Sequence, residues 1–321
     1  MTVTQAGEFG LIARITDRLA TGTPGLGGDG QPSVLLGPGD DAAVVAAPDG
    51  RVVVGTDVLV DGRHFRRDWS GPVDIGRRAA AANLADIAAM GARPTALVVA
   101  LSMPPELEAA WVEGLADGLA AEAAAVGAAV VGGDLSASPT LTVAVTALGD
   151  LAGAAPVTRS GAAPGDVVAM AGRLGHAAGG LTVLTRGFRS PKLLVEAYRR
   201  PVVPYAAGPA AAALGATAMI DVSDGLLADT GHIAAASAVA IDLHRDAFEV
   251  PAPMRNAGEA LGADPYDWIL TGGDDHALVA TFPDGTDLPD DWRRIGEVRE
   301  GTGVSVDGRP FAGAGGWDHF R

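Results

Sequence analysis

The 321-residue chain contains no cysteine. Disulfides, thiolate nucleophiles, iron–sulfur clusters and cysteine-based zinc sites are therefore excluded. Lysine is almost as scarce, because Lys192 is the only one among 23 basic residues. It lies in Ser190-Pro191-Lys192, with no glycine-rich loop before it. This excludes a phosphate-binding P-loop and the kinase pattern that needs a strand lysine, so any phosphate chemistry would have to use metals and arginine.

Basic residues are also few relative to acidic ones, which number 39 and give a formal net charge of -16. A surface this acidic repels nucleic acid and anionic membranes, so we expect neither as a partner. The start, Met1 to Gly10, lacks the basic and apolar regions of a secretory signal. The most alanine-rich stretch, Leu119 to Val131, carries Glu122 and is too short for a membrane span. We therefore expect a cytoplasmic protein.

The composition, 48% hydrophobic and 19% charged, is typical of a well-packed globular protein. At this length a single core usually stops growing, which favours two domains. The segment Leu151 to Gly165 combines Ala-Pro, Gly and Ala-Pro-Gly, and indicates the connection between them. We predict domains at 1–150 and 151–321, each of them mixing strands with helices. The expected fold class is α/β (α+β mixed-sheet).

Hydrophobic periodicity predicts the individual elements. Phe9, Ile12, Ile15 and Leu19 have helical spacing, and Gly91 with Pro94 beyond it is a typical helix end. A strand is expected to end at Gly132-Gly133-Asp134. The other expected helices lie at 74–90, 106–126, 175–187, 205–214 and 224–236, and the other strands at 34–37, 43–47, 51–56, 95–102, 140–148, 166–171, 217–222, 238–243, 276–282, 292–298 and 303–306.

Six short clusters rich in aspartate and glycine are the most informative feature of the chain. They are Gly37-Pro38-Gly39-Asp40-Asp41, Gly55-Thr56-Asp57, Asn83-Leu84-Ala85-Asp86, Gly132-Gly133-Asp134, Asp221-Val222-Ser223-Asp224-Gly225 and Gly272-Gly273-Asp274-Asp275. Several follow an apolar run, which predicts that their carboxylates lie at strand ends, where active sites of α/β proteins collect. Aspartates gathered there would repel one another unless cations lay between them. Hard cations with oxygen ligands, above all Mg²⁺ carrying phosphates, suit such a group.

Each cluster taken alone also has an ordinary structural interpretation. Asp-Gly and Gly-Asp are common turn signals, and Asp224 could simply cap the helix that follows it. Asp86 lies inside an alanine-rich helix, where a charge is expensive to bury without a partner, although it could face solvent. Turns alone do not require an acidic residue at each of six positions, so the set as a whole favours a functional site.

The clusters belong to a longer ordered series of motifs. The series runs through Gly7-Glu8-Phe9-Gly10-Leu11-Ile12, Gly37 to Ala42, Thr56 to Phe65, Asn83 to Gly91, Gly132 to Asp134, Thr158-Arg159-Ser160-Gly161, Pro164-Gly165-Asp166, Asp221 to Leu226, Gly272 to Asp275 and Gly316-Trp317-Asp318-His319-Phe320. It closely resembles the thiamine-monophosphate kinase family, which belongs to the superfamily of aminoimidazole ribonucleotide synthetase and selenophosphate synthetase. The resemblance spans nearly the whole chain. His64-Phe65 and the Trp-Asp-His-Phe ending point to this kinase within the superfamily.

The resemblance implies ATP-dependent phosphorylation of thiamine monophosphate to thiamine diphosphate, with ATP as co-substrate and several Mg²⁺ ions as cofactors. The acceptor is a phosphate whose second pKa is near ~6, so its nucleophilic oxygen needs no general base. Metals and positioning would carry an in-line transfer between two polyanions. The resemblance also implies an N-terminal ATP- and Mg-binding α/β domain, a C-terminal α/β domain, an active site in the cleft between them, and a homodimer whose N-terminal sheets meet.

The family pattern, carried over position by position, implies a role for each candidate residue. The metal ligands implied are Asp41, Thr56, Asp57, Asp86, Asp134, Asp221 and Asp224. Gly133, Asp134 and Ser223 would contact the nucleotide, and Arg159 its phosphates. His64, Asp274 and Trp317 would bind thiamine monophosphate. Taken singly, His64 would more often be an exposed loop histidine and Trp317 a packing anchor near the C-terminus, and their place in the family pattern reverses this preference.

The chain departs from the family pattern at a few positions. Asp274 stands where Glu is usual, Gly55 where Ser is frequent, Ala85 where Ser is common and His276 where Tyr is. Two other readings stay open. One is another ATP-using synthetase of the superfamily, although sister enzymes with an essential cysteine do not fit this sequence. The other is a non-catalytic Mg-nucleotide sensor, which would need fewer metals.

Overall fold

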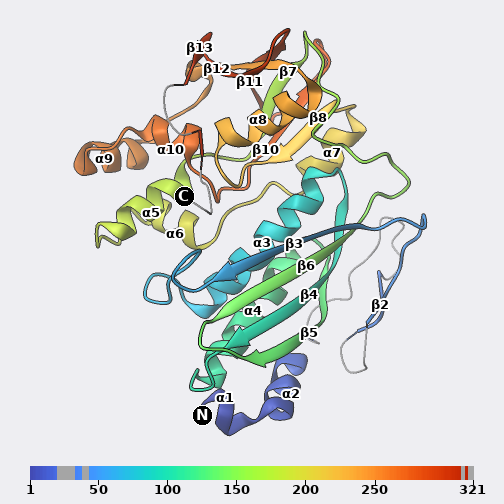
Figure 1. The fold of residues 1–321 in the computed structure, drawn as a ribbon, viewed down its shortest axis with the longest axis vertical. Helices are drawn as coiled ribbons and strands as arrows, with labels where there is room; N and C mark the ends of the chain where they lie inside the picture. Colours follow the sequence, from blue (N-terminus) through green and yellow to red (C-terminus); the bar gives the residue numbers. More distant parts are fainter. Residues whose placement is uncertain (20–32, 38–42, 312–314, 317–321) are drawn as a thin grey trace. The chain divides into compact units, whose positions relative to one another are not determined.

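The computed structural model describes residues 1–19, 33–37, 43–311 and 315–316. Of the predicted site residues, Asp41 and Trp317 lie outside this range. The chain divides into two compact units (Figure 1). The N-terminal unit comprises Met1–Ile87 and Ala92–Ala154, and the C-terminal unit comprises Ala88–Gly91 and Ala155–Arg321.

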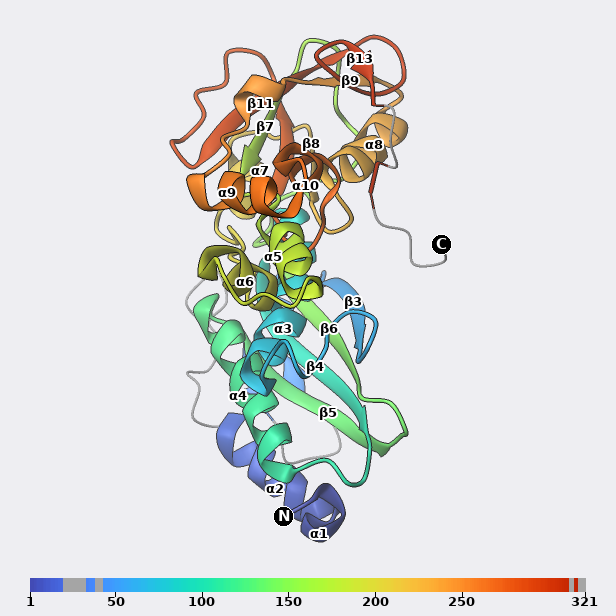
Figure 2. The same ribbon diagram turned by 90° about the vertical axis from the view of Figure 1, so that its left-hand side faces the viewer.

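The N-terminal unit is a four-stranded sheet with helices on one face (Figures 1 and 2). Its strands run in the order β3-β6-β4-β5, with β4 and β5 parallel and the other pairs antiparallel. In chain order its elements are α1 (Val3–Ala6), α2 (Glu8–Leu19), β1 (Val34–Leu36), β2 (Val44–Val45), β3 (Val53–Val60), α3 (Pro72–Ala89), β4 (Arg93–Met103), α4 (Ala109–Ala125), β5 (Ala129–Ala137) and β6 (Thr142–Asp150).

Helices α3 and α4 lie unusually close together because glycines form their contact. A Cβ at Gly76 of α3 would come 2.2 Å from the Leu115 carbonyl oxygen, and one at Gly118 of α4 would come 2.2 Å from that of Val73. The alanine-rich sequence of α3 lets it pack flat against the sheet, where Leu84 and Ile87 are almost completely buried. Each such large apolar side chain stabilises the fold by roughly 1.5–3 kcal/mol.

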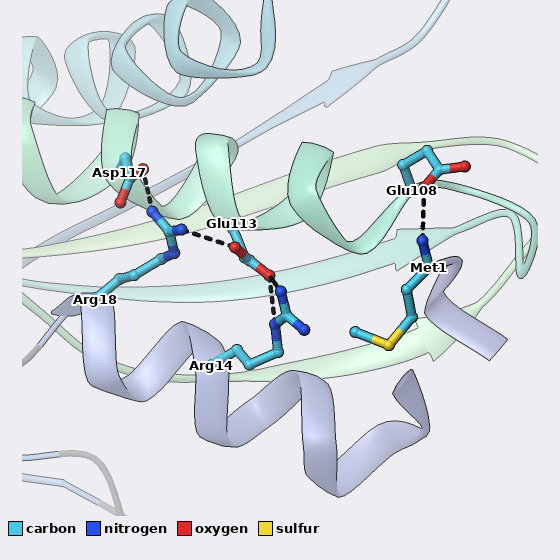
Figure 3. A network of polar contacts seen from close by, with 6 residues as sticks. All are labelled: Met1, Arg14, Arg18, Glu108, Glu113 and Asp117. Carbon is cyan, nitrogen blue, oxygen red and sulfur yellow. Dashed lines mark hydrogen bonds and ion pairs between the residues drawn. The ribbon is translucent and has the colours of Figure 1, made fainter. Parts of the chain in front are cut away.

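An ion-pair network attaches α2 to α4 (Figure 3). Glu113 of α4 is only 6% exposed and accepts from both Arg14 and Arg18 of α2. Arg18 also pairs with the more exposed Asp117 one turn further along α4. A buried carboxylate needs such partners, because breaking the pair would leave an uncompensated charge. These arginines and carboxylates, together with Asp17, line a groove of about 420 Å³.

The C-terminal unit is a seven-stranded sheet with the order β13-β12-β9-β11-β7-β10-β8, antiparallel except for the parallel pair β12 and β9. In its hydrophobic core, buried side chains of the central strands pack against Ala207 and Ala211 of α7. Within this core Phe282 and Trp292 pack edge to face. In chain order its elements are β7 (Val167–Ala171), α5 (His176–Thr185), α6 (Lys192–Arg199), α7 (Ala207–Ala213), β8 (Ala218–Asp221), α8 (Leu226–Ser237), β9 (Ala240–Leu243), η1 (Arg245–Ala247), α9 (Ala252–Leu261), α10 (Pro265–Thr271), β10 (Leu278–Phe282), β11 (Trp292–Arg299), β12 (Gly303–Val306) and β13 (Arg309–Pro310).

The expected α/β class with mixed sheets is confirmed, and the expected helices and strands occur with shifts of a few residues at their ends. The expectation that the aspartates lie at strand ends is wrong for two of them. Asp57 lies in the middle of β3, because Val58 to Val60 continue to pair with β6. Asp134 lies within β5, whose pairing with β4 continues to Ala137. The expectation is correct for Asp221, the last residue of β8.

The short helices α1, α6, α9 and α10 and the 3-10 helix η1 were not expected from the sequence. None of the helices seen in the described residues combines the length and hydrophobicity needed to span a bilayer.

Gly133 provides a test of the packing in the N-terminal sheet. A Cβ at Gly133 would lie 2.0 Å from the Val99 carbonyl oxygen, directly after a register shift between β4 and β5, whereas one at Gly132 would meet nothing within 4 Å. We therefore expect Gly133→Ala to destabilise the protein by about 1–3 kcal/mol, as overpacking typically does. Gly132→Ala, its neighbour and control, should change stability by less than about 1 kcal/mol. Urea unfolding of both variants measures the difference, and equal effects would contradict the close approach.

Candidate active site

Asp57 on β3 and Asp86 on α3 both belong to the place where this strand and this helix adjoin. Alternation along β3 places Gly55 and Asp57 on the face covered by α3. A Cβ at Gly55 would lie 3.7 Å from Oδ2 of Asp86, so the Asp86 carboxylate rests against this glycine. The Asp57 backbone N–H donates to Oδ1 of Asn83 at 3.0 Å, and Asn83 in turn donates to the Ala79 carbonyl. Asn83 and Asp86, three residues apart, share one side of α3.

Thr56 lies on the other face of β3, because adjacent strand residues point in opposite directions. Its hydroxyl donates to the Val145 carbonyl at 2.9 Å and accepts from the Thr146 hydroxyl at 3.1 Å. The Thr56 hydroxyl is therefore separated from the carboxylates of Asp57 and Asp86. The structure does not bring these three predicted metal ligands together through their side chains.

His64 lies in the turn after β3. The backbone N–H of Val60 donates to Nδ1 of His64 at 3.0 Å. Nδ1 is therefore the acceptor, and the neutral ring carries its proton on Nε2. The next residue, Phe65, is 1% exposed and fixes the turn to the core. His64 can thus offer an Nε2–H donor from a well-anchored turn.

Gly133 and Asp134 lie on the opposite edge strand of the same sheet. Asp57 pairs with Val145, Val145 with Val99, and Val99 with Gly133, so these four residues form one row across the sheet. With strands about 4.8 Å apart, the two edges are separated by roughly 14 Å. Within the N-terminal unit, Asp134 is therefore not a neighbour of Asp57 or Asp86. Its nearest recorded partner is the Ser136 hydroxyl, which donates to it at 3.1 Å.

In the C-terminal unit, Asp221 and Asp224 belong to one tight loop between β8 and α8. Asp221 is 4% exposed, and its Oδ2 accepts from Nδ1 of His276 at 3.0 Å. His276 is equally buried and donates its backbone N–H to the Val222 carbonyl. The imidazole therefore fixes the orientation of the Asp221 carboxylate. Ser223 and Asp224, partly exposed, follow directly.

A further carboxylate lies behind this loop. Oδ2 of Asp229, in the first turn of α8, accepts the backbone N–H groups of Ser223, Asp224 and Gly225 at 3.1, 3.1 and 3.0 Å. Burial, together with repulsion from Asp221 and Asp224, raises the pKa of Asp229 to about 7 despite these hydrogen bonds. Three carboxylates thus crowd one loop, which is the electrostatic situation that a cation relieves.

A second loop, Gly272 to His276, interlocks with the first. The Asp274 N–H donates to the Ser223 carbonyl at 2.9 Å, and a Cβ at Gly273 would lie 1.9 Å from that oxygen. Asp274 and His276 both have positive φ, at 66° and 52°. Non-glycine residues adopt this conformation at some energetic cost, and such residues cluster at functional sites.

Asp275, between those two strained residues, is 1% exposed. Its Oδ1 accepts the Ala177 N–H at the start of α5, while Oδ2 is buried and meets no hydrogen-bond partner among the described residues. Burial raises the pKa of Asp275 to about 7, against the opposing effects of the Ala177 N–H and the nearby Arg173. Asp275 therefore anchors the second loop to α5.

Two further predicted site segments lie beside α8, Arg159 at its C-terminal end and Gly316 at the loop before its start. Arg159 is exposed, and its backbone is attached by a hydrogen bond from the Ser237 hydroxyl to its carbonyl at 3.2 Å. Gly316, which precedes Trp317, lies against the loop, since a Cβ there would come 2.5 Å from the Asp224 carbonyl oxygen. Ala228 also donates its N–H to the Gly315 carbonyl. The chain leading to Trp317 is thus placed beside Asp224.

None of the predicted ligands belongs to a group of three whose donor atoms lie within 4.8 Å in the described part of the chain. The one such group there consists of Asp242, His244 and Glu297, on the adjacent strands β9 and β11 and the residue after β9. Arg299 already neutralises it, with Nη2 3.0 Å from Oδ2 of Asp242. Burial raises the pKa of Asp242, but bonds from Ser305 and Gly308 and the charge of Arg299 outweigh this and lower it. This group is a structural ion pair.

Comparison with known proteins decides the family. The AIR synthase related protein N-terminal domain family matches residues 39–151. Thiamine-monophosphate kinase of Mycobacterium tuberculosis is 51% identical over 99% of this chain and 93% of its own length. The chain belongs to the thiamine-monophosphate kinase family. The resemblance predicted from its motifs is therefore confirmed, and the protein is an enzyme of the kinase class.

Solved structures agree with this assignment. The crystal structure of thiamine-monophosphate kinase from Stenotrophomonas maltophilia K279a has a TM-score of 0.80 at 36% identity, covering 94% of this chain and 97% of the other. AaThiL complexed with AMPPCP and TMP also has a TM-score of 0.80, at 31% identity, and covers 100% of this chain and 99% of its own. Both share the two-unit mixed-sheet architecture along essentially the whole chain.

The site contains four side chains to which the sequence assigned no role: Asn83, Asp229, Asp275 and His276. Two of these four residues could have been recognised from the sequence. Asn83 precedes Asp86 by three residues, which places both on one helix face, and Asp275 adjoins the predicted Asp274. Asp229 and His276 gave no such signal, since their partners are the backbone of residues 223–225 and the side chain of Asp221.

The raised pKa of Asp275 predicts a pH dependence of stability. The folded protein keeps this proton up to about pH 7, whereas the unfolded chain releases it near its ordinary value of 3.8. The free energy of unfolding should therefore fall as pH rises from about 4 to 7. In Asp275→Asn the slope of the unfolding free energy against pH should be smaller by the equivalent of up to about one bound proton. The slope that remains is the contribution of Asp229. Urea unfolding at several pH values measures it, with exposed Asp267→Asn as control; an unchanged slope would contradict the buried carboxyl.

Proposed function

We propose that the protein transfers the γ-phosphate of ATP to thiamine monophosphate, producing thiamine diphosphate and ADP, by an Mg²⁺-assisted in-line displacement. The observation that carries the proposal is the family membership over the full chain, together with AaThiL complexed with AMPPCP and TMP. AMPPCP stands in for ATP, with a methylene group replacing the oxygen that bridges the β- and γ-phosphates. That structure therefore represents a donor and an acceptor held together.

The chemistry of the acceptor explains why the site needs no general base. A phosphate monoester has a second pKa near ~6, so its attacking oxygen is largely deprotonated at neutral pH. What remains is to align two polyanions and to offset their repulsion. Carboxylate-bound metal ions and an arginine can do both without a lysine, which this chain lacks at every candidate position.

The donor set fits Mg²⁺, which prefers oxygen ligands. In the N-terminal unit, Asp57 and Asp86 would hold it, with Gly55 leaving room beside the Asp86 carboxylate. In the C-terminal unit, Asp221 and Asp224 would do so, on a loop where like charges already crowd. Bound Mg²⁺ would neutralise phosphate charge and polarise the transferring group. Asp41, Asp134 and Thr56 remain predicted ligands.

The remaining residues would position the two substrates. Ser223 and Gly133 would contact the nucleotide and Arg159 its phosphates, for which an exposed guanidinium offers paired donors. On the thiamine side, His64 would donate through Nε2–H, because Nδ1 is engaged by the Val60 backbone. Asp274, held at positive φ, would face the cationic or amino-bearing part of thiamine, and Trp317 would stack on a ring.

The homodimer remains a prediction, and the free face of the N-terminal sheet supports it. Val54, Val58 and Val98 lie on the face opposite α3, with exposures of 63%, 46% and 37%. Exposed apolar side chains grouped on a sheet indicate an interaction surface. Light scattering should give twice the chain mass of 32.1 kDa for the parent protein and a lower mass for Val58→Asp. A monomeric parent protein would exclude this dimer.

Activity is tested by incubating the protein with ATP, Mg²⁺ and thiamine monophosphate and separating the products. Thiamine diphosphate and ADP should form in equal amounts, and only when Mg²⁺ or Mn²⁺ is present. Asp57→Asn and Asp86→Asn should each lower turnover by about a hundredfold or more, since a lost ligand under-coordinates the cation. The exposed, arginine-paired Asp68 provides the control, as Asp68→Asn should retain parental turnover.

The alternatives give different results in the same assay. A non-catalytic nucleotide sensor would bind ATP and Mg²⁺ but form no thiamine diphosphate. Another synthetase of the superfamily would leave thiamine monophosphate unconsumed and would release ADP only when its own acceptor is added. Parental turnover in both Asp57→Asn and Asp86→Asn would contradict the assignment of the metal ligands while leaving the reaction itself in place.

A further inference from the structure

Asp229 has an unusual set of hydrogen bonds for a buried acid. The residue is 2% exposed, and a single oxygen, Oδ2, accepts three consecutive backbone N–H groups, those of residues 223–225. Its position in the first turn of α8 places the carboxylate at the end of the helix where N–H groups lack intrahelical partners. The N-cap residue is Gly225, which has no side chain with which to cap the helix. Asp229 therefore does from within the helix what a capping residue usually does from outside it.

The N–H groups that Asp229 holds belong to residues with proposed roles in the site. Ser223 is a proposed nucleotide contact and Asp224 a proposed metal ligand. The Ser223 carbonyl also accepts the Asp274 N–H at 2.9 Å, which connects the thiamine-side loop to the same point. Gly225 has φ of 127°, and a Cβ there would lie 2.6 Å from the Thr271 carbonyl oxygen. The loop therefore packs closely against the end of α10 at a position that only glycine can occupy.

The three hydrogen bonds hold Asp229 in place against an unfavourable electrostatic environment. Asp221 and Asp224 both repel a charge at Asp229, so burying this carboxylate beside them is unfavourable. A neutral acceptor could cap the helix without that repulsion. The three N–H groups are nevertheless bound to Oδ2, which suits a loop that must be held in one conformation to receive a cation.

We propose that Asp229 is a positioning residue that holds the backbone of Ser223 to Gly225 in the conformation that presents Asp224 to the metal ion. The proposal rests on the proposed function for the identity of the metal. The role assigned to Asp229 is that of an acceptor, because its Oδ2 is directed to the three backbone donors. Outer partners of metal ligands typically change metal affinity by about 10–100-fold when removed.

Two substitutions that remove the same charge separate positioning from charge. Asp229→Asn keeps an oxygen that can accept the three N–H groups, whereas Asp229→Ala leaves them without an acceptor. We expect Asp229→Ala to weaken Mn²⁺ binding by about tenfold or more and Asp229→Asn by less than about threefold. Mn²⁺ alone is titrated into the full-length protein, and the free ion is measured by electron paramagnetic resonance. Asp267→Ala, which removes an exposed first-turn acid from α10, is the control.

The outcomes are distinct. Equal weakening in Asp229→Asn and Asp229→Ala would overturn the proposal, because it would show that the charge and not the acceptor matters. A fall in melting temperature with unchanged Mn²⁺ affinity in both variants would also overturn it, since the role would then be structural only. The titration uses neither thiamine monophosphate nor turnover. If no thiamine diphosphate forms in the activity assay, the proposed function fails, while the Mn²⁺ affinities still decide the role of Asp229.

Discussion

Repulsion between carboxylates is the constraint to which much of this structure responds. With a net charge of -16, the chain still places Asp221, Asp224 and Asp229 around one short loop. Donors other than arginine hold two of them there: the His276 imidazole donates to Asp221, and three backbone N–H groups donate to Asp229. Elsewhere arginines do this work, as with Glu113 between Arg14 and Arg18 and Asp242 beside Arg299.

Close backbone approaches fix the geometry around these charges. Gly273 allows the Asp274 N–H to reach the Ser223 carbonyl, and Gly133 allows β5 to approach Val99. A side chain at either position would collide with a carbonyl oxygen, so each glycine has a structural reason to be present. By contrast, a Cβ at Gly55 would make only ordinary contacts at 3.7 Å with Asp86. The serine frequent in the family at this position would therefore fit here, and its replacement by glycine leaves the fold unaffected.

Much of the fold could be predicted from the sequence, because periodic segments such as Glu8–Leu19 carry their own signal. The short helices α9 and α10 were missed since each has proline in its first turn, where proline is favourable although it ends helices elsewhere. Asp57 and Asp134 were placed at strand ends because their clusters directly follow short apolar runs, Val52 to Val54 and Val130-Val131, which suggested that the strands stop there. Pairing with β6 and β4 overrides that local preference. The roles of His276 and Asp229 depend on contacts with distant or backbone atoms, which no local pattern contains.

The central claim is that aspartates of each unit bind the metal ions of the nucleotide. It is tested most directly by a crystal structure of the protein with Mn²⁺ and AMPPCP, using the anomalous scattering of manganese to locate the ions. We expect anomalous peaks within about 2.0–2.6 Å of carboxylate oxygens of Asp57 or Asp86 and of Asp221 or Asp224, the range of metal–oxygen bonds. Manganese bound only at Asp242, His244 and Glu297, with none at these aspartates, would contradict the account.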